Sequence, residues 1–183
     1  TFSSCNDAFQ SGCYHGVIQA YLTEGGSVDS VRATRLCNEI APAEADRWLR
    51  FQCVHGLGHG FEMALNVELP RALNRCHWLH SSWDRYSCYG GVFMENAVAS
   101  MPGGHHTAAH ALALSAPSGD SSMAGMNRMA GMGHEHAPDP TKITFKMRDS
   151  ADALYPCSAV DTTYQFSCYQ LQGGLILNRV HSD

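Results

Sequence analysis

Apolar residues recur along this chain at the spacing of α-helices, and the alternating pattern of strands is almost absent. One such segment lies between a cap at residues 6–7 and the glycine pair at 25–26, and it places Ile18 and Leu22 on one helical face. The same spacing predicts three further long helices, over residues 43–65, 81–99 and 161–178. The second of these begins with an acidic turn at 43–46, which suits the positive end of a helix dipole.

Shorter helical segments precede three of these long helices. Their capping residues and apolar spacing predict helices over 27–37, 68–76 and 149–154. Only residues 143–145 resemble a strand, and they are few. The pattern therefore predicts an all-α protein.

The eight cysteines belong to a unit that occurs four times: a Cys, a spacer, and a second Cys that opens a glycine-dotted helix. The number is even, and no C-x2-C pair typical of zinc ribbons or thioredoxin-like sites is present. Eight cysteines allow 105 connectivities, and pairing within each unit is the simplest. We therefore expect four disulfide-stapled helical-hairpin repeats, with a metal–thiolate cluster as the alternative, and with the pairs Cys5–Cys13, Cys37–Cys53, Cys76–Cys88 and Cys157–Cys168.

Three glycines inside the second long helix argue against a simple helix. Gly56, Gly58 and Gly60 each cost about 1 kcal/mol relative to Ala in a helix interior. Close approach of a neighbouring helix would compensate for this cost, because a residue without a side chain lets two backbones meet. A less regular helix is the other possibility.

Residues 101–140 form a Met/His/Gly-rich insertion between the third and fourth units. This segment has few large apolar side chains, so a long surface loop is expected, with a short helix possible at 107–114. With 183 residues, the chain 1–183 is expected to form a single domain.

Charge and cysteine content indicate which partners and which cellular location to expect. Charged residues make up 16% of the chain and the net charge is −5, with no basic run, so nucleic acid is not an expected partner. No apolar stretch approaches the roughly 18 residues that would span a bilayer. Disulfides persist in oxidising compartments. Because the sequence starts at Thr1, it resembles a mature product after removal of a signal peptide, and a periplasmic or secreted location is expected.

Candidate chemistry starts with the residues that follow each second cysteine. His55 and His59 are four apart, which places both imidazoles on one helical face, where they can chelate one metal. His15 occupies the position in the first unit that His55 occupies in the second, and Met94 or Glu95 of the third unit could complete the site. Copper is the expected ion and zinc the alternative. Structural histidines, or acid–base histidines without metal, are the competing interpretations.

The insertion carries a second group of possible ligands. Its four regularly spaced methionines and two histidines are Met123, Met126, Met129, Met132, His134 and His136. Thioether sulfur favours Cu(I), and imidazole binds Cu(II), zinc or nickel. The stretch resembles the Met/His-rich segments of bacterial periplasmic copper-resistance proteins, and this resemblance implies contact with a soft metal. Adaptable methionine packing on a partner is the alternative.

Three functions follow from these observations. The first is an exported metal-binding protein that handles copper at a folded histidine site and a Met/His-rich loop. The second is an extracellular interaction module, or an accessory subunit of a larger extracellular or periplasmic assembly. The third is a copper- or zinc-dependent enzyme.

Overall fold

A computed structural model describes residues 2–6, 8–24, 29–42, 44, 46–101, 145–147 and 149–180. Within these ranges all regular structure is helical, so the predicted all-α class is confirmed for the described part of the chain. The elements are η1 (Phe2–Ser4), α1 (Ala8–Glu24), α2 (Ser30–Ile40), α3 (Arg47–Ala64), α4 (Leu69–Arg75), η2 (Cys76–Trp78), α5 (Ser82–Ala99) and α7 (Thr162–Val180). The possible strand at 143–145 and the possible helix at 107–114 fall wholly or mainly outside the described residues.

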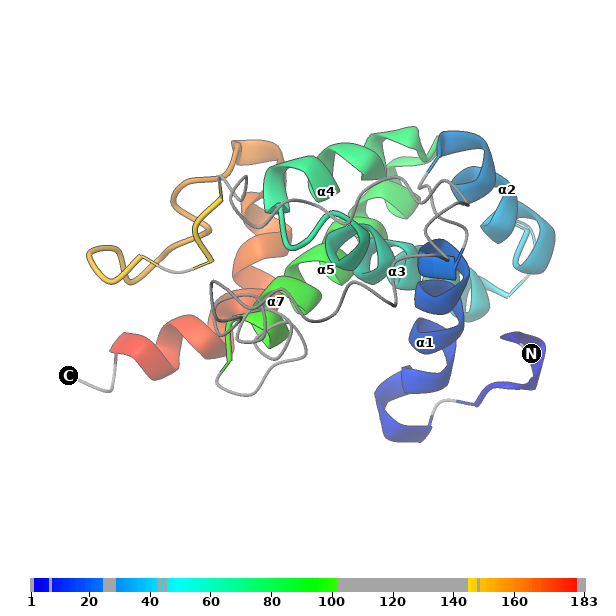
Figure 1. Cartoon of the computed structure of the whole chain (residues 1–183), viewed down its shortest axis with the longest axis horizontal. Helices are drawn as coiled ribbons and strands as arrows, with labels where there is room; N and C mark the ends of the chain where they lie inside the picture. The colour runs from blue at the N-terminus through cyan, green and yellow to red at the C-terminus, as the bar shows by residue number, and fades with distance from the viewer. Residues whose placement is uncertain are drawn as a thin grey trace, which may run out of the picture.

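The four long helices pack in the order in which they occur along the chain. Helix α3 lies between α1 and α5, and α7 packs on α5. Figure 1 shows this row from α1 on one side of the molecule to α7 on the other, with α3 and α5 in the middle. The short helix α4 packs on both α3 and α5, and α2 packs on α3. The core therefore lies between α3 and its neighbours, where Ile18, Leu57, Phe61 and Phe93 are fully buried.

Side-chain caps set the beginning of three helices. Asp29 accepts a hydrogen bond from the Arg32 N–H at the start of α2, and the Ser81 hydroxyl accepts one from the Asp84 N–H in α5. Asp46 caps α3 in the same way. The predicted start of α3 at residue 43 is therefore wrong, because Asp46 caps the helix instead of contributing to its first turn.

The glycines of α3 bring the helix backbones into direct contact, as the sequence predicts. A Cβ at Gly58 would lie 2.1 Å from the carbonyl oxygen of Cys88 on α5, and one at Gly91 would lie 2.0 Å from that of His55. These overlaps are with backbone atoms, which cannot turn away. Helices α3 and α5 can cross at this distance only because both positions lack a side chain, and α3 remains a continuous helix throughout.

All four predicted disulfides are present with the predicted pairing. Two of them join one helical segment to the next, as in a hairpin: α2 to α3, and the end of α4 to α5. The other two join a non-helical segment to a helix, because Cys5 precedes α1 and Cys157 lies in a series of turns. The prediction of four helical hairpins is therefore wrong for the first and fourth units.

The predicted helix at 149–154 is replaced by turns for a local reason. The Asp149 carboxylate accepts a hydrogen bond from the Ala151 N–H, and the Asp152 carboxylate accepts one from the Leu154 N–H. Aspartate side chains that capture the N–H two residues later compete with helical hydrogen bonds and favour turns. The helix begins only after residue 161, at the start of α7.

Two polar networks run through the otherwise apolar interior. Arg50 of α3 makes a bidentate ion pair with Asp84 of α5, at 2.6 and 3.2 Å. Deeper in the row, the Asn96 amide donates to Glu62 at 3.2 Å, and Gln172 of α7 donates to the Asn96 oxygen at 2.9 Å. These contacts fix the register of α3, α5 and α7 relative to one another.

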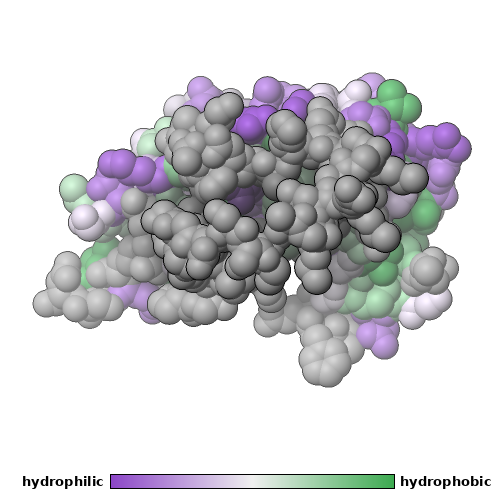
Figure 2. Space-filling model, viewed as in Figure 1, coloured by the Kyte–Doolittle hydropathy of each residue, from purple (hydrophilic) through white to green (hydrophobic). Residues whose placement is uncertain are grey.

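The helices outside the row expose their polar sides. Figure 2 shows hydrophilic residues along the edge that α2 and α4 occupy. Helix α4 buries Leu69, Ala72 and Leu73 toward α3 and α5. Among the described helices, none combines the length and apolar character that a membrane crossing requires.

Candidate metal centre

Three histidines from two neighbouring helices converge between α1 and α3. His15 lies on α1, and His55 and His59 lie one turn apart on α3. The ring centroids are 4.7 Å apart for His15 and His59, 5.1 Å for His55 and His59, and 5.2 Å for His15 and His55. Each ring offers a nitrogen that lies within 4.8 Å of the nitrogens offered by the other two. The structure therefore brings together the three histidines that the sequence analysis grouped.

Glycines again create the space in which these rings meet. A Cβ at Gly56 would lie 3.1 Å from the Ile18 side chain and 3.7 Å from the Cα of His15, so its absence lets α1 approach α3. On α5, a Cβ at Gly90 would lie 3.3 Å from Nδ1 of His55. The glycines of α3 and α5 thus belong to the construction of the site as well as to helix packing.

Hydrogen bonds at Nδ1 orient both histidines of α3. Nδ1 of His55 lies 3.1 Å from the Ser87 carbonyl oxygen, which can only accept, so this nitrogen carries the proton. Nδ1 of His59 lies 2.8 Å from a carboxylate oxygen of Glu95. In the neutral form of each ring, Nε2 is therefore the nitrogen with an available lone pair. Metal-ligating histidines typically have this arrangement, with the second nitrogen bound to a carboxylate or a carbonyl.

Two ring nitrogens of the cluster have no partner among the described residues. Nε2 of His15 and Nε2 of His59 are both buried and make no hydrogen bond within the described part of the chain. A buried polar atom without a partner costs about 1–3 kcal/mol. Three imidazoles at the usual metal–nitrogen distance of about 2.0–2.1 Å would have their nitrogens about 3.4 Å apart. The nitrogens of the observed cluster, which lie within 4.8 Å of one another, would therefore have to move closer together to bind one ion.

Burial keeps two of the three histidines, His15 and His55, neutral. It lowers the pKa of His55 to about 3, with the neighbouring rings of His59 and His15 acting in the same direction. The pKa of His15 is lowered to about 4, mainly by burial and then by His59, while Gln52 and Glu95 oppose this lowering. Both rings are therefore neutral at pH 7. Because only neutral imidazole binds a metal ion, protons compete with the metal at these two rings only in strongly acidic solution.

An open pocket of about 300 Å³ leads to the cluster from the surface. The helices α1, α3 and α5 form its walls, and it is lined by Gly12, His15, Gly16, His59, Met63, Glu95 and Val98. A Cβ at Gly12 or Gly16 would meet no atom of the described residues within 4 Å, so bare backbone forms part of the wall on α1. An ion bound by the histidines would therefore have room for a further ligand on the pocket side.

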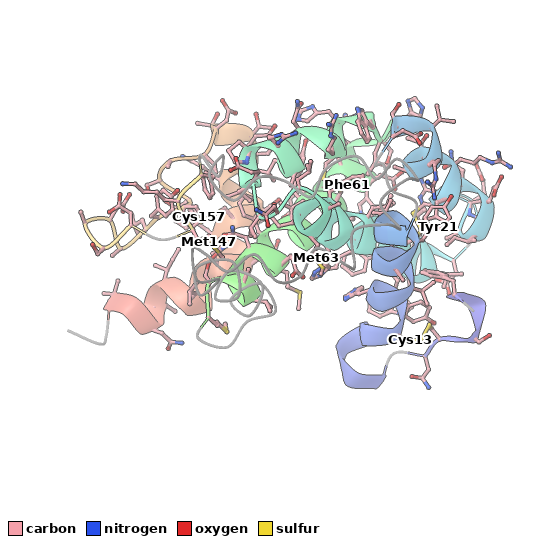
Figure 3. All side chains as sticks on the ribbon, in the orientation of Figure 1. Cys13, Tyr21, Phe61, Met63, Met147 and Cys157 are labelled. Carbon is pink, nitrogen blue, oxygen red and sulfur yellow. A yellow bond between two sulfur atoms is a disulfide. The ribbon has the colours of Figure 1, made fainter. Side chains whose placement is uncertain are left out.

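Met63 is a possible ligand in the pocket wall that the sequence analysis did not propose. It lies four residues after His59, so His55, His59 and Met63 form one stripe along α3. Figure 3 shows its side chain between α5 and α1. The signal was present in the sequence, because the H-x3-H spacing continues as H-x3-H-x3-M.

The other predicted ligands have different positions. Glu95 lines the pocket and accepts a hydrogen bond from His59, so it orients one of the three rings. Met94 is half-buried on the same helix and is not among the residues that line the pocket. The predicted ligands of the insertion lie outside the described residues: Met123, Met126, Met129, Met132, His134 and His136.

Comparison of the chain with models of protein families, with curated proteins and with solved structures finds no match. The site's own chemistry is therefore the basis for a functional proposal.

Proposed function

We propose that this protein binds a transition-metal ion, copper in the first place and zinc as the alternative, through His15, His55 and His59. The observation that carries the proposal is the pair of buried Nε2 atoms that find no partner among the described residues and belong to rings from two different helices. A cluster of purely structural histidines would be expected to satisfy these nitrogens with protein donors. A metal ion would satisfy them together.

The preference for copper rests on donor types. Imidazole binds both Cu(II) and zinc, whereas thioether sulfur favours Cu(I). The chain has eight methionines, one in the pocket wall and four in the segment 123–132. We propose that the folded site holds the ion and that the Met/His-rich segment captures or transfers it. The four disulfides are consistent with an oxidising compartment, and we propose the periplasm or the exterior of the cell.

The test compares histidine variants of the full chain after removal of bound metal with a chelator. One variant carries Ala at all three site histidines, and the control carries His80→Ala, because His80 is exposed and lies outside the cluster. Titration with Co(II), followed by its visible absorption, reports coordination at the folded site. We expect one equivalent to bind to wild type and to the control, with the absorption lost in the triple variant. Equal spectra in all three proteins would overturn the proposal, and circular dichroism verifies the fold.

A metal-dependent enzyme is the second candidate, and the open pocket beside the histidines favours it. Zinc in such a site would activate water, and copper would react with dioxygen. Loading the metal-free protein with each ion, followed by assays of activated-ester hydrolysis and of dioxygen consumption, tests this candidate. Rates no higher than those of the free ions would remove it.

A further inference from the structure

Among the described residues that line the pocket, Met63 is the soft donor. Met63 shares its wall with His15 and His59, and it follows His59 by one helical turn on α3. Its side chain is half-buried, whereas His55 and His59 are buried. The stripe therefore runs from the interior, at His55, to the entrance of the pocket, at Met63.

A thioether in this position differs from the other donors of the pocket in its metal preference. Its sulfur is uncharged and is not protonated at any pH near neutrality, and it favours Cu(I) over zinc. The carboxylate in the wall, Glu95, is engaged by Nδ1 of His59. Met side chains have three rotatable bonds and adapt to irregular spaces, so a half-buried methionine can turn toward an ion in the pocket.

We propose that Met63 is the fourth ligand of the site and makes it selective for Cu(I) over Zn(II). This proposal rests on the three-histidine site proposed above. Three imidazoles and a thioether form a neutral ligand set, so Cu(I) bound there carries a single positive charge, whereas zinc would carry two in the same partly buried place. The low charge and the soft sulfur favour the same ion.

The position of Met63 also suggests how the ion enters. Because this residue lies nearest the surface on the stripe, the thioether is the first donor of α3 that an incoming ion meets. Transfer to His59 and His55 then carries the ion from a half-exposed donor to buried ones. Each of these donors binds an ion as a neutral ligand.

The experiment compares Met63→Leu with Met94→Leu in the full chain. Leucine conserves apolar volume and favours helix, so the substitution removes the sulfur with little other change. Met94 provides the matched control, because it is also half-buried, lies on the neighbouring helix and does not line the pocket. Cu(I) affinity is measured by competition with a chromophoric Cu(I) chelator, and Zn(II) affinity by competition with a zinc indicator. Sulfur coordination is read from X-ray absorption of the Cu(I)-loaded proteins.

We expect Met63→Leu to weaken Cu(I) binding by about tenfold or more and to remove sulfur from the copper shell of the folded site, while Zn(II) affinity changes by about twofold at most. Met94→Leu should change neither. Equal loss of both metals would show that Met63 acts through packing, and unchanged Cu(I) affinity and copper shell would show that it is no ligand. Either result overturns this proposal but leaves the three-histidine site standing. That site fails separately, if the triple histidine variant keeps its Co(II) spectrum, and the present proposal then fails with it.

Discussion

The buried carboxyl of Glu62 leads to a prediction about stability whose sign is unusual. Glu62 is fully buried on α3, and burial raises its pKa to about 8, with Glu95 and Glu68 acting in the same direction against the Asn96 hydrogen bond. In the unfolded chain the same carboxyl has its ordinary pKa of 4.5. Between these two values the folded protein holds a proton that the unfolded chain has lost. Stability contributed by this group therefore falls as the pH rises from 4.5 to about 8.

Between the two pKa values, the free energy of unfolding falls by about 1.36 kcal/mol for each pH unit. The pKa itself is known to about one unit. At pH 7 the buried carboxyl costs about 3 kcal/mol, and Glu62→Gln should recover most of this free energy of unfolding. Glutamine has the same shape and keeps the oxygen that accepts from Asn96. The second oxygen of a protonated carboxyl carries an O–H donor, and the amide of Gln carries an N–H donor at the same place. The substitution therefore leaves the hydrogen-bond donors around residue 62 nearly unchanged.

The assay is urea denaturation with intact disulfides and a metal chelator, at pH 6.5 and at pH 8. This pH range limits the contribution of His15 and His55, whose pKa values are lowered in the fold. These two residues make stability depend on pH mostly below pH 6.5, where they gain protons in the unfolded chain. Between pH 6.5 and pH 8, titration of Glu62 should lower the free energy of unfolding of the wild type by about 2 kcal/mol. This contribution should be absent from Glu62→Gln. The control is Glu44→Gln, an exposed position with an expected change within about 0.5 kcal/mol. Parallel pH dependence in wild type and Glu62→Gln would refute the reasoning, because Glu62 would then be ionised in the fold.

Two further predictions concern the contacts between α3 and α5. Gly58→Ala should destabilise the protein by about 2 kcal/mol or more, because its Cβ would lie 2.1 Å from a backbone oxygen, whereas Gly174→Ala, with nothing within 4 Å, should gain up to about 1 kcal/mol. Urea denaturation of both variants checks this difference, and equal effects would contradict the close approach. Asp84→Asn should cost about 3–5 kcal/mol, since it leaves the buried Arg50 guanidinium without its ion pair. Thermal denaturation measures this loss, and recovery in the double variant Arg50→Met/Asp84→Leu separates it from damage to packing; a loss below about 1 kcal/mol in Asp84→Asn would contradict the buried pair.

Much of the fold could be predicted from local signals. Periodic apolar residues identify α1, α3, α5 and α7 to within a few residues, because amphipathic helices repeat every 3.6 residues whatever their partners. The disulfide pairing was accessible because each second cysteine lies only 8 to 16 residues after the first. The turns at 149–157 were missed because aspartate can serve as a helix cap or capture an N–H in a turn, and the sequence alone does not decide between them.

The site was predictable in part. The H-x3-H pair lies within one helix, so its geometry follows from helical spacing alone. That His15 meets this pair depends on how closely α1 approaches α3, which the contact at Gly56 sets. The role of Glu95 depends in turn on the crossing of α3 and α5, and this crossing directs its carboxylate to Nδ1 of His59. Contacts between helices are settled by packing over the whole row. Helical spacing therefore placed only His55 and His59 with respect to each other, and His15 was grouped with them from its equivalent position in the first unit.

The way in which the helices are held bears on how a metal could be used. The backbone contact at Gly58 and Gly91 and the ion pair of Arg50 with Asp84 hold α3 against α5, and the close approach of Ile18 to Gly56 holds α1 against α3. These contacts use atoms other than the imidazoles. In small zinc modules, by contrast, metal binding supplies the folding free energy, so the ion leaves only as the domain unfolds. Here several contacts of the scaffold are independent of the proposed ligands. A metal could therefore enter and leave through the open pocket without unfolding of the helices, which is what transfer to another carrier requires.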